Sequence, residues 1–305
     1  MGYAAIIILI LIVIVIWIDP EKKTLDDVFR RKLGKNYISL PDGIVHYELE
    51  GPESAPTIVL VHGFSVPSYI WDPTFFALVQ AGFRVLRFDL YGRGFSDRPR
   101  AVYTINFFVD QLAALLDALE LKTPVHLVGL SMGGPISAAF SRKFPEKVRS
   151  VTLIDPLVSP FSKIKILPLL LHGMGELVMA VYGEPIMLPK AQEGDLCEPG
   201  KFPDYVEKFK EQIQYKGFRR AILSTLRNLT KINTHPDYQA LNDLGIPSIL
   251  FRGSEDRTIP AKDMDVLCQL VPTIEFHQIE GTGHIPHYEK PDVVNPILLD
   301  FFGKN

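Results

Sequence analysis

The sequence has few cysteines and little net charge. Its 305 residues include only Cys197 and Cys268, which form no C-x-x-C pair, so they offer neither a disulfide framework nor a thiol-based metal site. A net charge of −3 gives no basic face for a nucleic-acid partner. An internal repeat, an H-E-x-x-H pair and a P-loop are also missing. With 47% hydrophobic residues, the chain is too apolar to be mainly disordered, which leaves a globular protein with a large core.

The first 18 residues contain a long hydrophobic run. Residues 3–18 read YAAIIILILIVIVIWI, which as a helix spans somewhat less than a bilayer core of roughly 30 Å. A secretory signal would need a basic start and small residues at its cleavage site, and both are absent; a buried core helix is the other alternative. The run favours a single-pass membrane anchor over residues 1–18. Because the basic residues all follow it, the rest of the chain is expected on the cytoplasmic side.

Residues 19–35 are expected to form an amphipathic connector. Thr24 can cap a short helix and Gly34 can end it. Lysines and arginines surround its apolar face, which fits either an interfacial helix against acidic headgroups or a solvated connector.

From residue 36 onward, short β-rich runs alternate with helical patterns. Strands are expected at 44–49, 57–61, 84–88, 125–130, 148–154, 248–251 and 273–279, with helices between them. This alternation predicts an α/β fold with a mostly parallel central sheet flanked by helices, built from residues 36–156 and 245–305. Residues 157–244 contain no convincing strand and are expected to form a helical cap over the carboxyl ends of the strands.

A predicted strand runs directly into the motif Gly129-Leu130-Ser131-Met132-Gly133, and a predicted helix follows. A sharp strand-to-helix turn needs small residues on both sides, and it holds the central serine at its apex. Ser131 is therefore the candidate nucleophile.

A serine hydroxyl needs a base, and the base needs an acid. His284 follows the predicted strand 273–279 in a glycine-containing loop, and His287 is the rival base. Asp256 follows the strand 248–251 at the same end of the sheet; Glu255 and Asp155 are the rival acids. The resulting chain order, Ser131, Asp256 and His284, is that of α/β-hydrolases.

Two backbone N–H groups are candidates for an oxyanion hole. Met132 N–H follows the nucleophile at the start of the helix, and Phe64 N–H lies in the loop after the strand 57–61. His62 in this loop is expected to be a structural hydrogen-bonding residue. No metal or organic cofactor is expected.

Five segments together resemble the α/β-hydrolase superfamily over about residues 40 to 302: His62-Gly63-Phe64, Asp89 to Asp97, Gly129 to Gly134, Gly253 to Asp256 and Gly281 to His284. The apolar N-terminus, the HGF loop and the SMGG elbow resemble membrane-bound monoacylglycerol lipases and related bacterial lipases. This resemblance implies hydrolysis of a lipid-like ester, with Ser131 as nucleophile, His284 as base and Asp256 as acid.

Other activities share this fold and triad. Carbon–carbon hydrolases, aminopeptidases and perhydrolases remain alternatives, and so does a non-catalytic anchored binding protein. A serine at position 131 argues against dehalogenases and epoxide hydrolases, which use an aspartate nucleophile.

Overall fold

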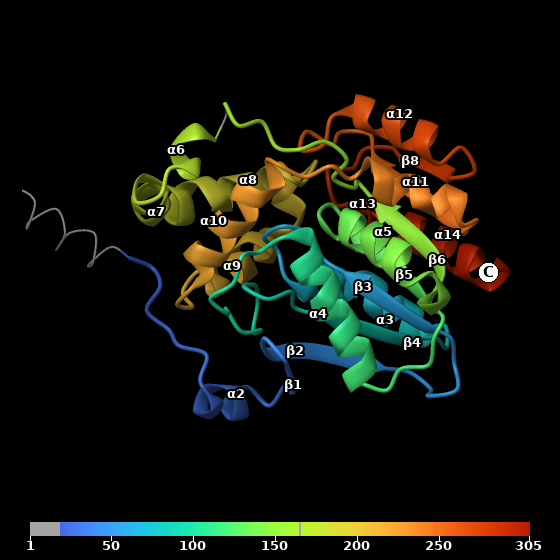
Figure 1. Ribbon diagram of the computed structural model, residues 1–305, viewed down its shortest axis with the longest axis horizontal. Helices are drawn as coiled ribbons and strands as arrows, with labels where there is room; N and C mark the ends of the chain where they lie inside the picture. Colours follow the sequence, from blue (N-terminus) through green and yellow to red (C-terminus); the bar gives the residue numbers. More distant parts are fainter. Residues whose placement is uncertain (1–18, 165) are drawn as a thin grey trace, which may run out of the picture.

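The computed structural model describes residues 19–164 and 166–305. These residues form an eight-stranded sheet flanked by helices (Figure 1). Its strands lie in the order β1 (Asn36–Leu40), β2 (Gly43–Glu50), β4 (Arg84–Phe88), β3 (Thr57–Val61), β5 (Val125–Leu130), β6 (Val148–Ile154), β7 (Ser248–Gly253) and β8 (Glu275–Ile279). β2 pairs antiparallel with both β1 and β4, and every pair from β4 to β8 is parallel. The predicted mostly parallel sheet is therefore confirmed. β1 was not among the expected strands, because this edge strand carries little apolar signal.

Helices cover both faces of the sheet. Side chains alternate along β3, so that Ile58 and Leu60 face one layer while Val59 and Val61 face the other. The first layer contains α3 (Asp72–Gln80) and α14 (Pro291–Lys304). The second contains α4 (Ile105–Ala118), α5 (Gly133–Lys143), α11 (His235–Asp243) and α12 (Ala261–Leu270). All five side chains of β3 are buried, and each large aliphatic one contributes about 1.5–3 kcal/mol to folding.

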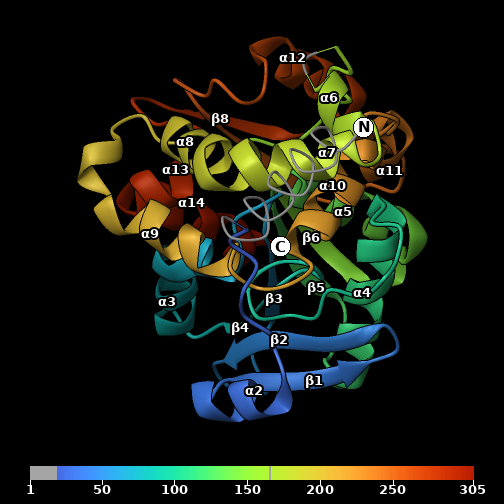
Figure 2. The ribbon, with the colours of Figure 1, turned by 90° about the vertical axis from the view of Figure 1, so that its left-hand side faces the viewer.

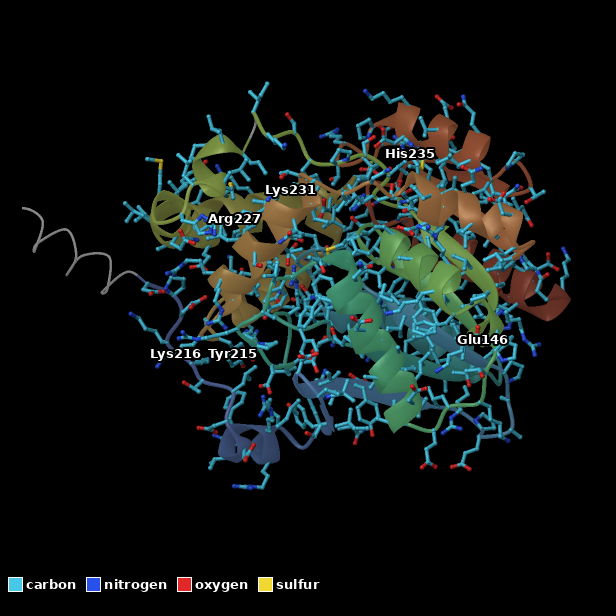
Figure 3. The ribbon with its side chains drawn as sticks, in the orientation of Figure 1. Glu146, Tyr215, Lys216, Arg227, Lys231 and His235 are labelled. Atoms are coloured by element: carbon cyan, nitrogen blue, oxygen red, sulfur yellow. The ribbon has the colours of Figure 1, made fainter. Side chains whose placement is uncertain are left out.

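A group of helices separates β6 from β7. It comprises α6 (Leu167–Leu170), α7 (Met174–Val178), a π-helix (Met179–Met187), α8 (Leu188–Gly194), α9 (Pro203–Gln212) and α10 (Phe218–Leu229), and α11 then returns to the sheet. These helices lie at the left of Figure 1 and face the viewer in Figure 2. Arg227 of α10, labelled in Figure 3, donates to the Leu169 carbonyl at 3.1 Å and to Glu176 at 2.9 Å, and so ties α6 and α7 to α10.

The residues before the sheet pack on this helical group and on the core. Lys23 pairs with Tyr215, and the Lys23 N–H donates to the Gln214 carbonyl at 2.8 Å. The following helix is α2 (Asp27–Leu33), which Gly34 ends with φ +62°. Asp26 caps it instead of Thr24, because the Asp26 carboxylate accepts the Phe29 N–H at 2.8 Å.

The predicted membrane location is contradicted. In residues 19–164 and 166–305, no helix is long and apolar enough to cross a bilayer. The longest helices of these ranges, α4 and α14, have 14 residues each. They are therefore about 21 Å long, against a bilayer core of roughly 30 Å. The predicted cytoplasmic side of the rest of the chain, which depended on this anchor, is corrected with it. Residues 1–18, to which the anchor was assigned, lie outside the described residues.

Candidate active site

Ser131 lies in the sharp turn between β5 and α5. Its φ is +52°, a left-handed conformation that is unusual for a serine. The turn is held by the Ser131 N–H, which donates to the Ile154 carbonyl at 2.9 Å. A Cβ at Gly129 would come within 2.3 Å of the Gly133 carbonyl oxygen, so the two backbone segments of the motif approach each other as closely as glycine permits. The strain at Ser131 is typical of a functional position.

Asp256 and His284 meet at the carboxyl ends of β7 and β8. The Nδ1 atom of His284 lies 3.0 Å from Oδ2 of Asp256, and both side chains are buried. The other carboxylate oxygen of Asp256 accepts the N–H groups of Thr258 at 2.7 Å and Ile259 at 3.2 Å. These contacts fix the carboxylate, and the carboxylate orients the imidazole.

Ser131 and His284 line the same cavity, whose volume is about 150 Å³. The structure thus brings the candidate nucleophile and base to one space. Within the described part of the chain, the Ser131 hydroxyl makes no hydrogen bond to His284. Such contacts are often long in the absence of substrate and tighten when substrate binds.

The pKa values at the site follow from burial and pairing. Burial alone would raise the pKa of Asp256, but His284 and the hydrogen bonds outweigh it and lower this pKa to about 2. Burial would lower the pKa of His284, but the charge and hydrogen bond of Asp256 raise it above its usual value. Asp256 is therefore ionised at neutral pH and stabilises an imidazolium on His284.

The rival residues lie in different surroundings. Glu255 is exposed to solvent. His287 is fully buried with its ring 4.4 Å from that of Trp71, and burial lowers its pKa to about 3, so it is neutral.

Asp155 follows β6 and lies beside Asp256. The atoms of Asp155, Asp256 and His284 that could ligate a metal all lie within 4.8 Å of one another. Both carboxylate oxygens of Asp256 have partners: Oδ1 accepts the Thr258 N–H, and Oδ2 lies 3.0 Å from Nδ1 of His284.

The loop after β3 lies against the nucleophile. A Cβ at Gly63 would be 3.2 Å from Cβ of Ser131. Within the described residues, neither Phe64 N–H nor Met132 N–H has a hydrogen-bond partner, so both remain available as donors.

Two buried side chains hold this loop. Nε2 of His62 accepts the Leu90 N–H at 2.9 Å, and Nδ1 lies 2.9 Å from the Gly63 carbonyl, which gives His62 the expected structural role. Arg93 donates through Nε to the Phe64 carbonyl at 2.8 Å. Burial lowers the pKa of Arg93 to about 9, so it stays cationic at neutral pH.

The helical group between β6 and β7 contributes cavity residues that the sequence did not single out. Leu188, Gln192 and Asp195, in or next to α8, line the cavity of Ser131. The carbonyl of Asp195 accepts the His284 N–H at 2.7 Å, which ties this group to the loop of the candidate base. No periodicity in the sequence shows which residues of this helical group face the site, because their placement depends on how the helices pack.

A second cavity adjoins the first. Its volume is about 250 Å³, and it shares Phe64 and Leu188 with the cavity of Ser131. Its walls are apolar except for one tyrosine, and consist of Phe64, Ile166, Pro168, Leu169, Val178, Met179, Tyr182, Met187, Leu188, Ile222 and Leu226.

Comparison with known proteins identifies similar hydrolases, by sequence and by fold. The model of the Alpha/beta hydrolase family matches residues 58–297. A 2-hydroxy-6-oxononadienedioate/2-hydroxy-6-oxononatrienedioate hydrolase of Paraburkholderia phymatum is 30% identical over 274 residues, covering 85% of this chain and 91% of its own. Carboxylesterase YbfK of Bacillus subtilis is 26% identical (87% of this chain, 86% of its own), and the human monoacylglycerol lipase ABHD6 is 23% identical (90% and 84%). The structure of an enol-lactonase from Burkholderia xenovorans LB400 superposes with a TM-score of 0.77 at 20% identity, covering 88% of this chain and 100% of its own, which shows likeness of fold.

Proposed function

This chain belongs to the alpha/beta hydrolase family, and we propose that within it the protein is a serine hydrolase that cleaves carboxylic esters with an apolar acyl chain. The observation that carries this proposal is that His284, whose ring is held by Asp256, lines the same cavity as Ser131 in its strained turn.

The proposed reaction has two stages. Ser131 attacks the acyl carbonyl while His284 takes its proton, and His284 then returns that proton to the leaving alcohol. Met132 and Phe64 N–H groups stabilise the oxyanion; each such donor lowers the barrier by about 3 kcal/mol. Water activated by His284 releases the acid from the acyl-enzyme.

The preference for an apolar acyl chain rests on the two adjoining cavities. A chain bound at Ser131 would pass Phe64 and Leu188 and continue between α6, α8 and α10. Burying each methylene there would contribute about 0.8 kcal/mol. Related proteins include a carboxylesterase and a monoacylglycerol lipase, and both names describe ester hydrolysis.

The charge of the catalytic cavity argues against a carbon–carbon hydrolase. The 30% identical relative is named for a dioate, which carries two carboxylates. Carboxylates are usually bound by arginine or lysine, and neither lines this cavity within the described residues.

Asp195 favours aminopeptidase activity as the second candidate. Asp195 lines the cavity of Ser131, and its carboxylate accepts the Thr258 hydroxyl at 2.9 Å, so this side chain could bind a substrate ammonium group. Burial, however, raises the pKa of Asp195, which weakens its charge.

A fluorophosphonate probe tests the nucleophile directly. We expect labelling of the wild type and of Ser54→Ala, which changes an exposed turn serine, and no labelling of Ser131→Ala. Ester hydrolysis by Ser131→Ala should fall by about 10⁴-fold or more. Equal labelling of all three proteins would refute the nucleophile assignment.

A substrate panel then tests which type of bond is cleaved and which acyl-chain length is preferred. p-Nitrophenyl butyrate and octanoate should be cleaved with higher kcat/KM than the acetate. Faster cleavage of an aminoacyl p-nitroanilide than of any ester would instead support the peptidase.

A further inference from the structure

Asp155 lies next to the candidate acid in an unusual backbone conformation. It follows β6, its φ is +39°, and its N–H donates to the Phe251 carbonyl of β7 at 2.9 Å. Its side chain is completely buried. A strained backbone at a buried carboxyl group, beside the proposed acid and base, points to a role in the site.

The two oxygens of Asp155 have different surroundings. Oδ2 accepts the Gly253 N–H at 3.0 Å. Oδ1 has no hydrogen-bond donor within the described residues, and the nearest cation, Nη1 of Arg252, is 3.9 Å away. An ionised carboxylate buried with one unpaired oxygen is strongly disfavoured, whereas a carboxylic acid can use that oxygen as a donor.

Asp256 supplies the acceptor. It lies within 4.8 Å of Asp155, and two carboxylates this close in a buried site do not both ionise. Asp256 already receives the Thr258 and Ile259 N–H groups and faces His284, so the negative charge belongs on Asp256 and the proton on Asp155.

We propose that Asp155 is a neutral carboxylic acid that donates a hydrogen bond to Asp256, and that it is a positioning residue for the proposed Asp256–His284 pair. Burial and the neighbouring charge of Asp256 raise the pKa of Asp155 well above its usual value, while the Asp155 hydrogen bond helps to lower that of Asp256. The donor holds the Asp256 carboxylate in place and withdraws part of its charge, so His284 is less basic than it would be without Asp155.

Other charged groups also face His284. Asp195, from the end of α8, favours its protonated form, whereas Arg252 of β7 disfavours it. His287 of α13 (Pro286–Glu289) is neutral and adds no charge. None of these groups changes in the variants below, so a shift in the pKa of His284 reports on Asp155.

Two substitutions separate a neutral donor from an ionised neighbour. In Asp155→Asn, the amide oxygen can accept the Gly253 N–H while the NH₂ group donates to Asp256. We therefore expect a kcat within about threefold of wild type and a His284 pKa within about 0.3 of the wild-type value. Asp155→Leu has a similar size but no donor. Here kcat should fall about tenfold or more at nearly constant KM, and the pKa of His284 should rise by about 0.5 or more, because Asp256 keeps its full charge.

The assay follows kcat/KM for p-nitrophenyl butyrate against pH, together with the His284 ring-proton shift by NMR. A His284 pKa that falls by about one unit in Asp155→Asn would overturn the proposal, because it would show a negative charge at position 155 in the wild type. The proposal would also be overturned if Asp155→Leu had the kcat and the His284 pKa of the wild type. If Asp155→Leu does not fold, the change in the pKa of His284 in Asp155→Asn still shows whether Asp155 is neutral or ionised in the wild type.

The kinetic readout rests on the proposed function, but the NMR readout does not. A wild-type protein that cleaves no ester would refute the proposed function and leave the titration of His284 as the test of Asp155.

Discussion

Gly253→Ala tests how closely the acid and base loops must approach. Gly253 ends β7, three residues before Asp256, and a Cβ there would lie 1.8 Å from the carbonyl oxygen of Gly283, the residue before His284. Contacts shorter than 3.0 Å are essentially never seen for a real Cβ, so the two loops must separate by about 1.2 Å. The clash is with backbone, so no side-chain rotation can relieve it.

The expected effect is mainly on catalysis. A displacement of about 1 Å at a reacting group can lower the rate by about 100-fold, and we expect a loss of kcat/KM of this size. Overpacking should also reduce the free energy of unfolding by about 1–3 kcal/mol. Hydrolysis of p-nitrophenyl butyrate and urea unfolding measure the two effects separately.

Gly303→Ala is the matched control. Gly303 lies in α14, and a Cβ there would meet no atom within 4 Å, so activity should be unchanged and stability equal or slightly higher. Gly253→Ala with a kcat/KM within threefold of wild type would show that the approach of the β7 and β8 loops does not position His284.

Two more predictions concern proton transfer and the oxyanion loop. Asp256 raises the pKa of His284 above its ordinary value of 6.5, and only neutral imidazole accepts the Ser131 proton, so kcat/KM should fall on the acid side of this raised pKa while Asp256, with a pKa of about 2, stays ionised. An acid limb below the ordinary histidine value would contradict this. Arg93→Met removes the donor to the Phe64 carbonyl and leaves buried acceptors unpaired, so kcat should fall more than KM changes and unfolding should cost about 2–4 kcal/mol less. A wild-type kcat for Arg93→Met in the same ester assay would show that Arg93 does not position the loop.

Local patterns in the sequence were enough to predict several elements. The alternation of strands and helices predicted the parallel sheet, because the spacing of apolar residues along each element shows which of its faces is buried. The Gly129-Leu130-Ser131-Met132-Gly133 motif predicted the sharp turn, and Gly129 is required by a contact within the motif, the approach of its backbone to the Gly133 carbonyl. Asp256 and His284 were predicted to lie at one edge because the carboxyl ends of parallel strands meet there.

Predictions that depended on overall composition or on contacts between distant segments were incomplete or wrong. β1 was missed because this edge strand carries little apolar signal, and the membrane location inferred from composition is not supported by any described helix. Asp155 was only a rival acid in the sequence, and its distinct role depends on burial and on its distance from Asp256.

The amino-acid sequence by itself determined the fold class and the candidates Ser131, Asp256 and His284, because short-range spacing and strand order specify them. Only the tertiary structure decided which side chains of the helices between β6 and β7 line the cavity, and that Asp155 is buried beside Asp256. Those properties arise from distances and burial between segments far apart in the chain, and no local pattern encodes them.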